Sequence, residues 1–185
     1  MVRCFVAVDV EDSEIIDKVV RVQGEIARLA RIKPVERENL HFTLKFLGEI
    51  PEEKVEAVRK ALLNLKFKTF RVQLKGVGVF PDYRYIRVIW IGAGEGSREL
   101  ISLQKVVDEI LVKLNFKKET EYTPHLTIAR VKGVLNREAL VTRLREMQSL
   151  EFGEIVVNRV RLKKSRLTAR GPVYTTLAEY PAREG

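Results

Sequence analysis

Sulfur and imidazole side chains are scarce in this chain. Its 185 residues include one cysteine, two methionines and two histidines. A single cysteine excludes an internal disulfide and a multi-cysteine zinc site within one chain. Cys4 stands in an apolar run, which is typical of a small core side chain rather than a reactive thiol. Chemistry that needs a side chain titrating near neutral pH therefore depends on His41 and His125.

Long apolar runs are also absent, and none approaches the ~20 residues that a membrane-spanning helix needs. The first ten residues are apolar, but acidic residues follow them and no small-residue cleavage site is present. They are expected to form a first strand rather than a signal peptide. We therefore expect no membrane association and a cytoplasmic location. The length suits one domain, or two small lobes that share a core.

Basic residues outnumber acidic ones by 34 to 25, which gives a net charge of +9 and a pI of ≈ 9.7. This balance favours an anionic partner, of which nucleic acid is the commonest. A heat-adapted protein with a charge-rich surface explains the same numbers, because 32% of the residues are charged and Cys, Met and His are scarce. Charge alone leaves both interpretations open.

Hydrophobic periodicity predicts an alternation of strands and helices. Helical spacing begins at Ser13, a candidate N-cap, and ends before Pro34; further helices are expected from Pro51 to about Leu63, from Ser97 to about Leu114 and from Asn136 to about Met147. Strands are expected at 2–10, 40–48, 70–80, 84–92, 122–131, 153–167 and 173–180.

The order of these elements repeats. Each half of the chain is predicted to contain, in this order, a strand, a helix, a strand with a histidine motif, a second helix and a last strand. The histidine motifs are HFTL at 41–44 and HLTI at 125–128, which lie 84 residues apart. A repeat of this length predicts two similar units packed against each other. The order favours an α+β fold with antiparallel sheets and helices on one face.

Side chains alternate between the two faces of a strand. His41 and Thr43 therefore share one face, as do His125 and Thr127, while the apolar residues between them face the other way. If the units form a pseudo-twofold pair, both imidazoles line one groove. One neutral and one protonated imidazole suit concerted acid–base catalysis, and the threonine hydroxyls can bind phosphate oxygens. In-line displacement at a cyclic phosphodiester needs neither metal nor ATP in this scheme.

Other uses of these residues are weaker. A metal site would need a third or fourth ligand, and no carboxylate stands at a companion spacing. Purely structural roles would not explain why the only two histidines of the chain occupy the same position in the same tetrapeptide pattern. The segment 89–97 has a glycine pattern near that of a dinucleotide-binding loop, but Ser97 occupies the third glycine position. We interpret it as a flexible turn into a helix.

Five segments together resemble the two-histidine (2H) phosphoesterases, and within them the RNA 2′,3′-cyclic phosphodiesterases, also called 2′-5′ RNA ligases. They are RCFVAVDV, ENLHFTLKFLGE, FPDYRYIRVIWIG, TPHLTIARVKG and KKSRLTARGPVYTTL. The resemblance implies one bilobal domain over 1–185, a pseudo-twofold duplicated α+β unit with two antiparallel sheets lining a central cleft and helices outside. It implies cofactor-free, metal-independent hydrolysis of RNA 2′,3′-cyclic phosphate ends to 2′-phosphates, with reverse 2′-5′ ligation.

The resemblance also assigns roles to single residues. It makes His41 the proton donor to the departing O3′ and His125 the proton acceptor that activates water. The chemistry of the residues themselves leaves these two roles interchangeable, because the halves are pseudo-symmetric. Thr43 and Thr127 are expected to hold phosphate oxygens. Arg130 matches a basic position after the second motif, but its odd offset from His125 requires the strand to bend before it can reach the site.

Three further features stay open at this level. Tyr122 can stack on a base if a neighbouring proline disturbs the alternation, and otherwise packs as an ordinary aromatic. Arg159, Arg161 and Lys163 share one strand face, which faces either an RNA backbone or solvent. Trp90 stands in an apolar strand and is expected in the core.

The expected partner is RNA with a 2′,3′-cyclic phosphate end, acted on by a monomeric enzyme. A non-catalytic RNA-binding module that uses the same basic cleft is the alternative, and a 2H enzyme acting on a small cyclic nucleotide is a third hypothesis. The presence of both histidines and both threonines favours catalysis. Turnover on oligonucleotide and mononucleotide substrates would separate the first hypothesis from the third.

Overall fold

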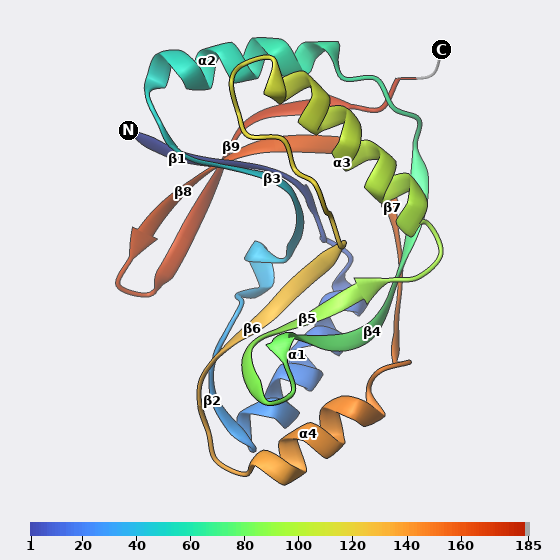
Figure 1. The fold of residues 1–185 in the computed structure, drawn as a ribbon. Coiled ribbons are helices and arrows are strands. Elements are labelled where there is room, and N and C mark those ends of the chain that lie inside the picture. Colours follow the sequence, from blue (N-terminus) through green and yellow to red (C-terminus); the bar gives the residue numbers. More distant parts are fainter. Residues whose placement is uncertain (184–185) are drawn as a thin grey trace.

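A curled antiparallel sheet forms the centre of the computed structural model, which describes residues 1–183 (Figure 1). Its strands are β1 (Val2–Asp9), β2 (Ala30–Pro34), β3 (His41–Ile50), β4 (Phe70–Asp82), β5 (Tyr85–Ala93), β6 (His125–Val134), β7 (Glu151–Val157), β8 (Arg159–Thr168) and β9 (Gly171–Pro181). The helices are α1 (Ser13–Ala27), α2 (Glu52–Ala61), α3 (Ser97–Val112) and α4 (Arg137–Glu146), with short 3-10 turns η1 (Arg37–Asn39) and η2 (Leu62–Asn64).

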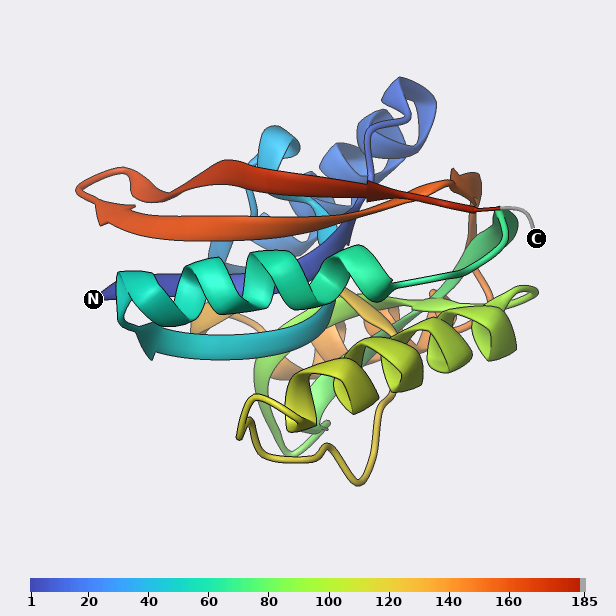
Figure 2. The same ribbon diagram turned by 90° about the horizontal axis from the view of Figure 1, so that it is seen from above.

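The sheet consists of two halves. Its strand order is β7-β4-β5-β6-β3-β1-β8-β9, and β2 pairs with β6. The halves join between β3 and β6 through the backbone pair Phe42–Leu126. Helices α2 and α3 lie outside the half that holds β1 and β3, while α1 and α4 lie outside the other (Figures 1 and 2). The predicted α+β architecture with antiparallel strands and outer helices is confirmed, and the two expected sheets are joined into one curled sheet.

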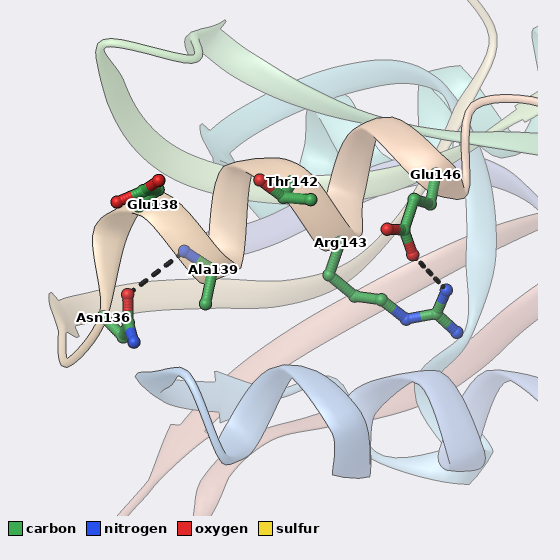
Figure 3. Close-up of a pocket in the computed structure, with 6 residues that line it drawn as sticks. All are labelled: Asn136, Glu138, Ala139, Thr142, Arg143 and Glu146. Atoms are coloured by element: carbon green, nitrogen blue, oxygen red, sulfur yellow. Dashed lines mark hydrogen bonds and ion pairs between the residues drawn. The ribbon is translucent and has the colours of Figure 1, made fainter.

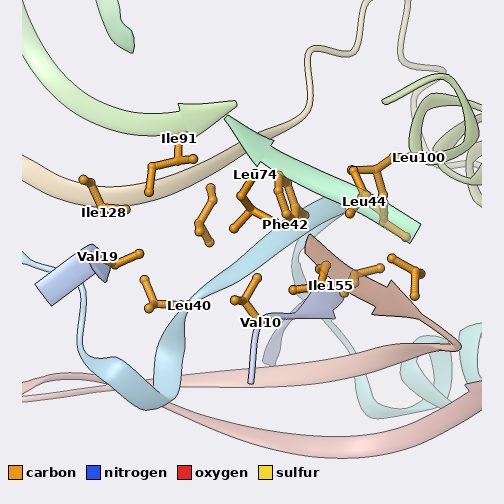
Figure 4. Packing of buried hydrophobic residues seen from close by; sticks show 14 of the residues in the cluster. Val10, Val19, Leu40, Phe42, Leu44, Leu74, Ile91, Leu100, Ile128 and Ile155 are labelled. Atoms are coloured by element: carbon orange, nitrogen blue, oxygen red, sulfur yellow. The ribbon is translucent and has the colours of Figure 1, made fainter. Parts of the chain in front are cut away.

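The core fills the space between the sheet and the helices (Figure 4). Phe42 and Leu44 of β3 and Ile128 of β6 point into it, and α1 adds Val19 from its apolar face. Burying a side chain of this size stabilises the fold by about 1.5–3 kcal/mol. Because the helix side of the sheet is apolar, the polar side chains of the same strands lie on the opposite face. No helix within residues 1–183 has the length and apolarity to cross a membrane.

The expected strand at 153–167 is wrong, because the chain breaks at Asn158 and forms two strands. β7 pairs with β4 at one end of the sheet, whereas β8 pairs with β1 in the other half. The Asn158 carbonyl accepts a hydrogen bond from the Ala182 amide at 2.8 Å rather than continuing a ladder. The run of valines and basic residues on both sides gives no local sign of this crossing.

Two smaller expectations also need correction. The cap of α1 is Asp12 rather than Ser13, since Asp12 Oδ1 accepts a hydrogen bond from the Ile15 amide at 3.1 Å. The sequence does not predict strand β2, because ARIKP lacks the usual β-branched composition. Its pairing with β6 is a tertiary contact that forms a strand where local propensity is low.

Candidate functional site

The two histidine motifs meet where the halves of the sheet join. Phe42 and Leu126 form the connecting backbone pair, and both side chains are fully buried on the helix side. Alternation places the flanking motif residues on the opposite face. All of these are partly exposed: His41, Thr43, His125 and Thr127. The structure therefore brings together the four polar residues that the sequence pattern singled out. We call this the motif face.

His41 is held by two hydrogen bonds. Its Nδ1 lies 2.7 Å from the Asn39 carbonyl oxygen, and its Nε2 lies 2.9 Å from Thr43 Oγ1. A carbonyl can only accept, so Nδ1 carries the proton. In the neutral ring, Nε2 then accepts from the Thr43 hydroxyl. Asn39 is itself fixed, because its amide donates to the Pro172 carbonyl at 3.0 Å.

His125 repeats this arrangement. Its Nδ1 lies 2.8 Å from the carbonyl oxygen of Thr123, again two residues upstream. The neutral ring therefore also carries its proton on Nδ1 and leaves Nε2 with a lone pair. The two imidazoles share this geometry although the 3-10 turn η1 precedes β3 and irregular chain precedes β6. Each half of the molecule thus presents one imidazole through the same nitrogen.

Aromatic rings hold each imidazole in place. The His41 ring lies 4.9 Å from Phe5 and 5.5 Å from Tyr174, centroid to centroid. The His125 ring lies 5.0 Å from Phe80 and 6.3 Å from Trp90. Such contacts limit rotation of the imidazoles and partly exclude water from them.

Burial lowers the pKa of His41 below its ordinary value of 6.5. The hydrogen bond to Asn39 and the charge of Asp9 oppose this shift, while the positive charges of Lys163 and His125 add to it. His41 is therefore neutral at neutral pH in the unliganded protein. Because the pKa of His41 is lower in the folded state than in the unfolded state, the neutral ring favours folding. This contribution is complete above pH 6.5 and is lost as the pH falls from 6.5 through the folded pKa.

A charged network lies beside His41 on the same face. Lys163 Nζ contacts both carboxylate oxygens of Asp9 at 2.9 Å, and Arg161 contacts Asp9 at 2.5 Å and Glu179 at 2.9 Å. The side chains of Lys163 and Arg161 are only 6% and 13% exposed. Arg161 and Lys163 are therefore largely buried and paired with carboxylates, whereas Arg159 on the same strand is 46% exposed and pairs with Glu179 at 3.4 Å.

A β-bulge interrupts both motif strands at the same position. In β3, Thr43 and Lys45 face consecutive residues of β1, which leaves Leu44 as the extra residue. In β6, Thr127 and Ala129 face consecutive residues of β5, and Ile128 is the extra one. A bulge adds one residue to one strand and shifts the alternation beyond it.

The bulges decide which way the fifth residue after each histidine points. Arg130 follows the bulge of β6 and is exposed, and its charge acts on Tyr174 of the other half. Arg130 could reach the site only if its strand bent, because its offset from His125 is odd. The bulge in β6 provides this bend. Phe46 holds the equivalent position in β3 and is 71% exposed. Sequence reasoning missed Phe46, although its offset from His41 equals that of Arg130 from His125.

Tyr122 packs as an ordinary aromatic, which is one of its two expected roles, whereas Trp90 does not lie in the core as expected. The Tyr122 ring packs against the core, and its hydroxyl donates a hydrogen bond to the Thr43 carbonyl at 2.8 Å, so the ring is not presented for base stacking. Trp90 lies beside Phe80 and His125 rather than in the core. Gly78 makes room for it, because a Cβ there would lie 2.3 Å from the indole ring.

A hollow of about 380 Å³ on α4 lies away from the histidines (Figure 3). It is lined by Asn136, Glu138, Ala139, Thr142, Arg143 and Glu146. Asn136 caps the helix, and Arg143 pairs with Glu146 at 3.1 Å and with Glu25 at 2.8 Å. Because Asn136 and Arg143 are already engaged in the helix cap and in ion pairs, the motif face remains the candidate site. Residues 1–183 contain no group of three or more His, Cys, Asp or Glu side chains placed to hold a metal ion.

A family model described as LigT-like phosphoesterase matches this chain twice, over residues 8–90 and 91–174. The chain belongs to this family. Each match contains one histidine motif, so the family unit occurs once in each half of the repeat. Membership of the family and the repeated geometry agree, because both rest on the same two segments.

Relatives within the family cover nearly the whole chain. A protein of Methanocaldococcus jannaschii named RNA 2′,3′-cyclic phosphodiesterase is 42% identical over 178 residues, which cover 96% of this chain and 99% of the relative. One of Archaeoglobus fulgidus with the same name is 43% identical over 175 residues, which cover 95% and 97% of the two chains.

Solved structures show the same fold. The crystal structure of the Thermus thermophilus protein TT0787 has a TM-score of 0.75 and 32% identity, with 98% of each chain covered. The structure of Escherichia coli LigT complexed with 3′-AMP has a TM-score of 0.77, with 99% of each chain covered. Its identity of 23% supports the fold alone.

Proposed function

We propose that this protein hydrolyses RNA ends that carry a 2′,3′-cyclic phosphate, and that its two halves act as one domain. The observation that carries this proposal is the pair of imidazoles on one face, each held through Nδ1 by a backbone carbonyl, with Nε2 of His41 bonded to the hydroxyl of Thr43 in the same motif. The name shared by its relatives supports the substrate, and the net charge of +9 suits an anionic one.

In the proposed reaction, Nε2 of neutral His125 accepts a proton from water as the water oxygen attacks phosphorus. The bond from phosphorus to O3′ breaks, and protonated His41 donates its Nε2 proton to that oxygen. Thr43, Thr127 and Arg130 hold the non-bridging oxygens, where negative charge develops. The products are a 2′-phosphate and a 3′-hydroxyl. A 5′-hydroxyl in place of water would give a 2′-5′ linkage by the same steps.

Wild-type protein is expected to convert a short RNA ending in a 2′,3′-cyclic phosphate to a 2′-phosphate, in EDTA and without ATP. The product end is identified by mass spectrometry and by its sensitivity to 2′- or 3′-specific enzymes. RNA ending in a 3′-hydroxyl is the control. A 3′-phosphate product would keep both histidines and change the leaving oxygen. No turnover by folded protein would favour the non-catalytic RNA-binding module.

The role of His41 as acid has a consequence for pH dependence. Burial lowers its pKa in the unliganded protein, whereas a bound anionic phosphate raises the pKa of a nearby imidazole. The basic limb of kcat/KM reports the free enzyme, and that of kcat reports the complex. We therefore expect the basic limb of kcat/KM at a lower pH than that of kcat. Full profiles of both constants test this, and the reverse order would contradict His41 as the acid.

A further inference from the structure

Asp9 is a carboxylate on the motif face, and it lies directly across the ladder from His41. The two residues are partners in the pairing of β1 with β3, so their side chains leave the sheet on the same side. Directly opposite residues of an antiparallel pair have Cβ atoms about 4.5–5.5 Å apart. The Asp9 side chain is only 11% exposed. A largely buried negative charge therefore faces the imidazole that the proposed reaction uses as its acid.

The equivalent place in the other half of the molecule carries no charge. The residue across the ladder from His125 is Gly92 of β5, which has no side chain. The two halves thus repeat the imidazole and its Nδ1 hydrogen bond but differ in what faces the ring. A negative charge favours the protonated form of an imidazole, which an acid needs, whereas a base must be neutral before it can accept a proton. The difference has the sign that the two proposed roles require.

A carboxylate at this place needs an explanation, because it repels the phosphate that Thr43 and Arg130 are proposed to hold. The contacts of Asp9 provide one. Both of its oxygens accept hydrogen bonds from Lys163 Nζ at 2.9 Å, and the Lys163 side chain is 6% exposed. A buried ammonium beside His41 disfavours a second positive charge on the imidazole. Asp9 supplies the charge that offsets this effect.

Arg161 does not remove the charge of Asp9 from this balance. Its guanidinium contacts Asp9, but it also pairs with Glu11 and with Glu179, each at 2.9 Å. Two further carboxylates therefore compensate the one charge of Arg161. The carboxylate of Asp9 remains as the partner of Lys163.

Charged and titratable side chains from four strands lie around the rings of His41 and Tyr174. They are Arg3 and Asp9 of β1, Arg161 and Lys163 of β8, Tyr174 of β9, and His125 and Arg130 of β6. Burial raises the pKa of Tyr174, so its hydroxyl is neutral near pH 7. The others apart from Asp9 are cations or become cations on protonation. Asp9 is thus the carboxylate of this set, and its charge favours the proton on His41.

We propose that Asp9 is a positioning residue for the acid step: its carboxylate offsets the buried charge of Lys163 and so keeps on His41 the proton that this ring donates to O3′. This inference rests on the proposed function and adds to it the group that sets the protonation state of the acid. Asp9 acts through the imidazole rather than on the reacting atoms.

The experiment titrates the imidazole of His41 by NMR in the protein without RNA. The chain has only two histidines, so His41→Ala identifies the signals of each ring, and His125 is the internal control. Asp9→Asn keeps the size of the side chain and removes its charge. It is expected to lower the midpoint of the His41 titration by about 0.5–1 pH unit. Lys163→Met is expected to raise the midpoint, because Asp9 stays charged and keeps Arg161 as a partner.

A purely structural role predicts the opposite sign for Asp9→Asn. Burial lowers the pKa of His41, so a loosened fold that admits water moves the midpoint up toward 6.5. An upward shift, or none, would overturn the proposal. If Asp9→Asn alone does not fold, the double variant with Lys163→Met replaces it, because it leaves no unpaired lysine charge. Its midpoint is expected below that of Lys163→Met, and equal midpoints would likewise contradict the role of Asp9.

Glu179→Gln is the matched control. Glu179 belongs to the same network through Arg161, but its side chain is 45% exposed, and its loss is expected to leave the midpoint and kcat/KM unchanged.

Kinetics on RNA with a 2′,3′-cyclic phosphate end connect the titration to the reaction. In Asp9→Asn, the basic limb of kcat/KM is expected to move to lower pH with the midpoint, which lowers kcat/KM on that limb by about 3- to 10-fold. A limb that stays in place while the midpoint moves would exclude Asp9 from the acid step. Absence of wild-type turnover would instead refute the proposed function, because the NMR titration is read without RNA.

Discussion

Alanine in place of either His41 or His125 is expected to lower kcat by about 10²–10⁴-fold on RNA with a 2′,3′-cyclic phosphate end. Each imidazole carries one of the two proton transfers, and the 183 described residues contain no other histidine. KM is expected to change little, because the threonines and Arg130 remain to bind the RNA. The measurement is steady-state kinetics on both single variants under identical conditions.

The double variant sharpens this test. If the histidines act as one acid–base unit, removing both costs hardly more than removing one, as is usual for residues that act together. Multiplicative losses would mean that each histidine acts in a separate way. RNA affinity of the single variants serves as the control, together with their unfolding curves. A folded variant that keeps wild-type turnover would exclude that histidine from catalysis.

The parts of the site that the sequence predicts are those set by local periodicity. His41 and Thr43 share a face because strands alternate with period two, and the 84-residue offset repeats this arrangement at His125 and Thr127. The single pair Phe42–Leu126 then brings the two local patterns together. Helix positions followed from apolar spacing and proline for the same reason: neighbours along the chain determine them.

The parts that the sequence does not predict depend on distant contacts. Asp9 pairs with Lys163 across 154 residues, so the basic run of β8 gave no sign that its charges are neutralised. The bulges at Leu44 and Ile128 change the direction of the side chains that directly follow them, but ordinary apolar residues form them. Phe46 was overlooked because strict alternation places it on the helix side.

Asn in place of Asp108 is expected to lower the free energy of unfolding by about 3–5 kcal/mol, because it leaves a buried charge on Lys45 without its partner. Lys45 Nζ lies 2.5 Å from Asp108 Oδ1, and the two side chains are 2% and 5% exposed. Lys45 also donates to the Lys117 carbonyl at 2.6 Å. Denaturant unfolding of wild type and variant measures the change.

Glu119→Gln is the matched control. Glu119 Oε1 lies 3.7 Å from Lys45 Nζ, but the Glu119 side chain is 47% exposed, so its loss is expected to cost less than about 1 kcal/mol. Replacing Lys45 with Met and Asp108 with Leu together is expected to recover most of the stability, because apolar packing can substitute for a buried ion pair. A loss below about 1 kcal/mol for Asp108→Asn would contradict a buried, paired charge.

The same pair connects stability to the site. Asp108 Oδ2 accepts a hydrogen bond from the Glu119 amide at 3.2 Å, so α3 and Lys45 together hold the segment that runs on to Tyr122 and Thr123. Tyr122 bonds to the carbonyl of Thr43, and the Thr123 carbonyl orients His125. Loosening this segment displaces His125 relative to His41. Asp108→Asn should therefore lower kcat under conditions where the protein stays folded, while Glu119→Gln should not.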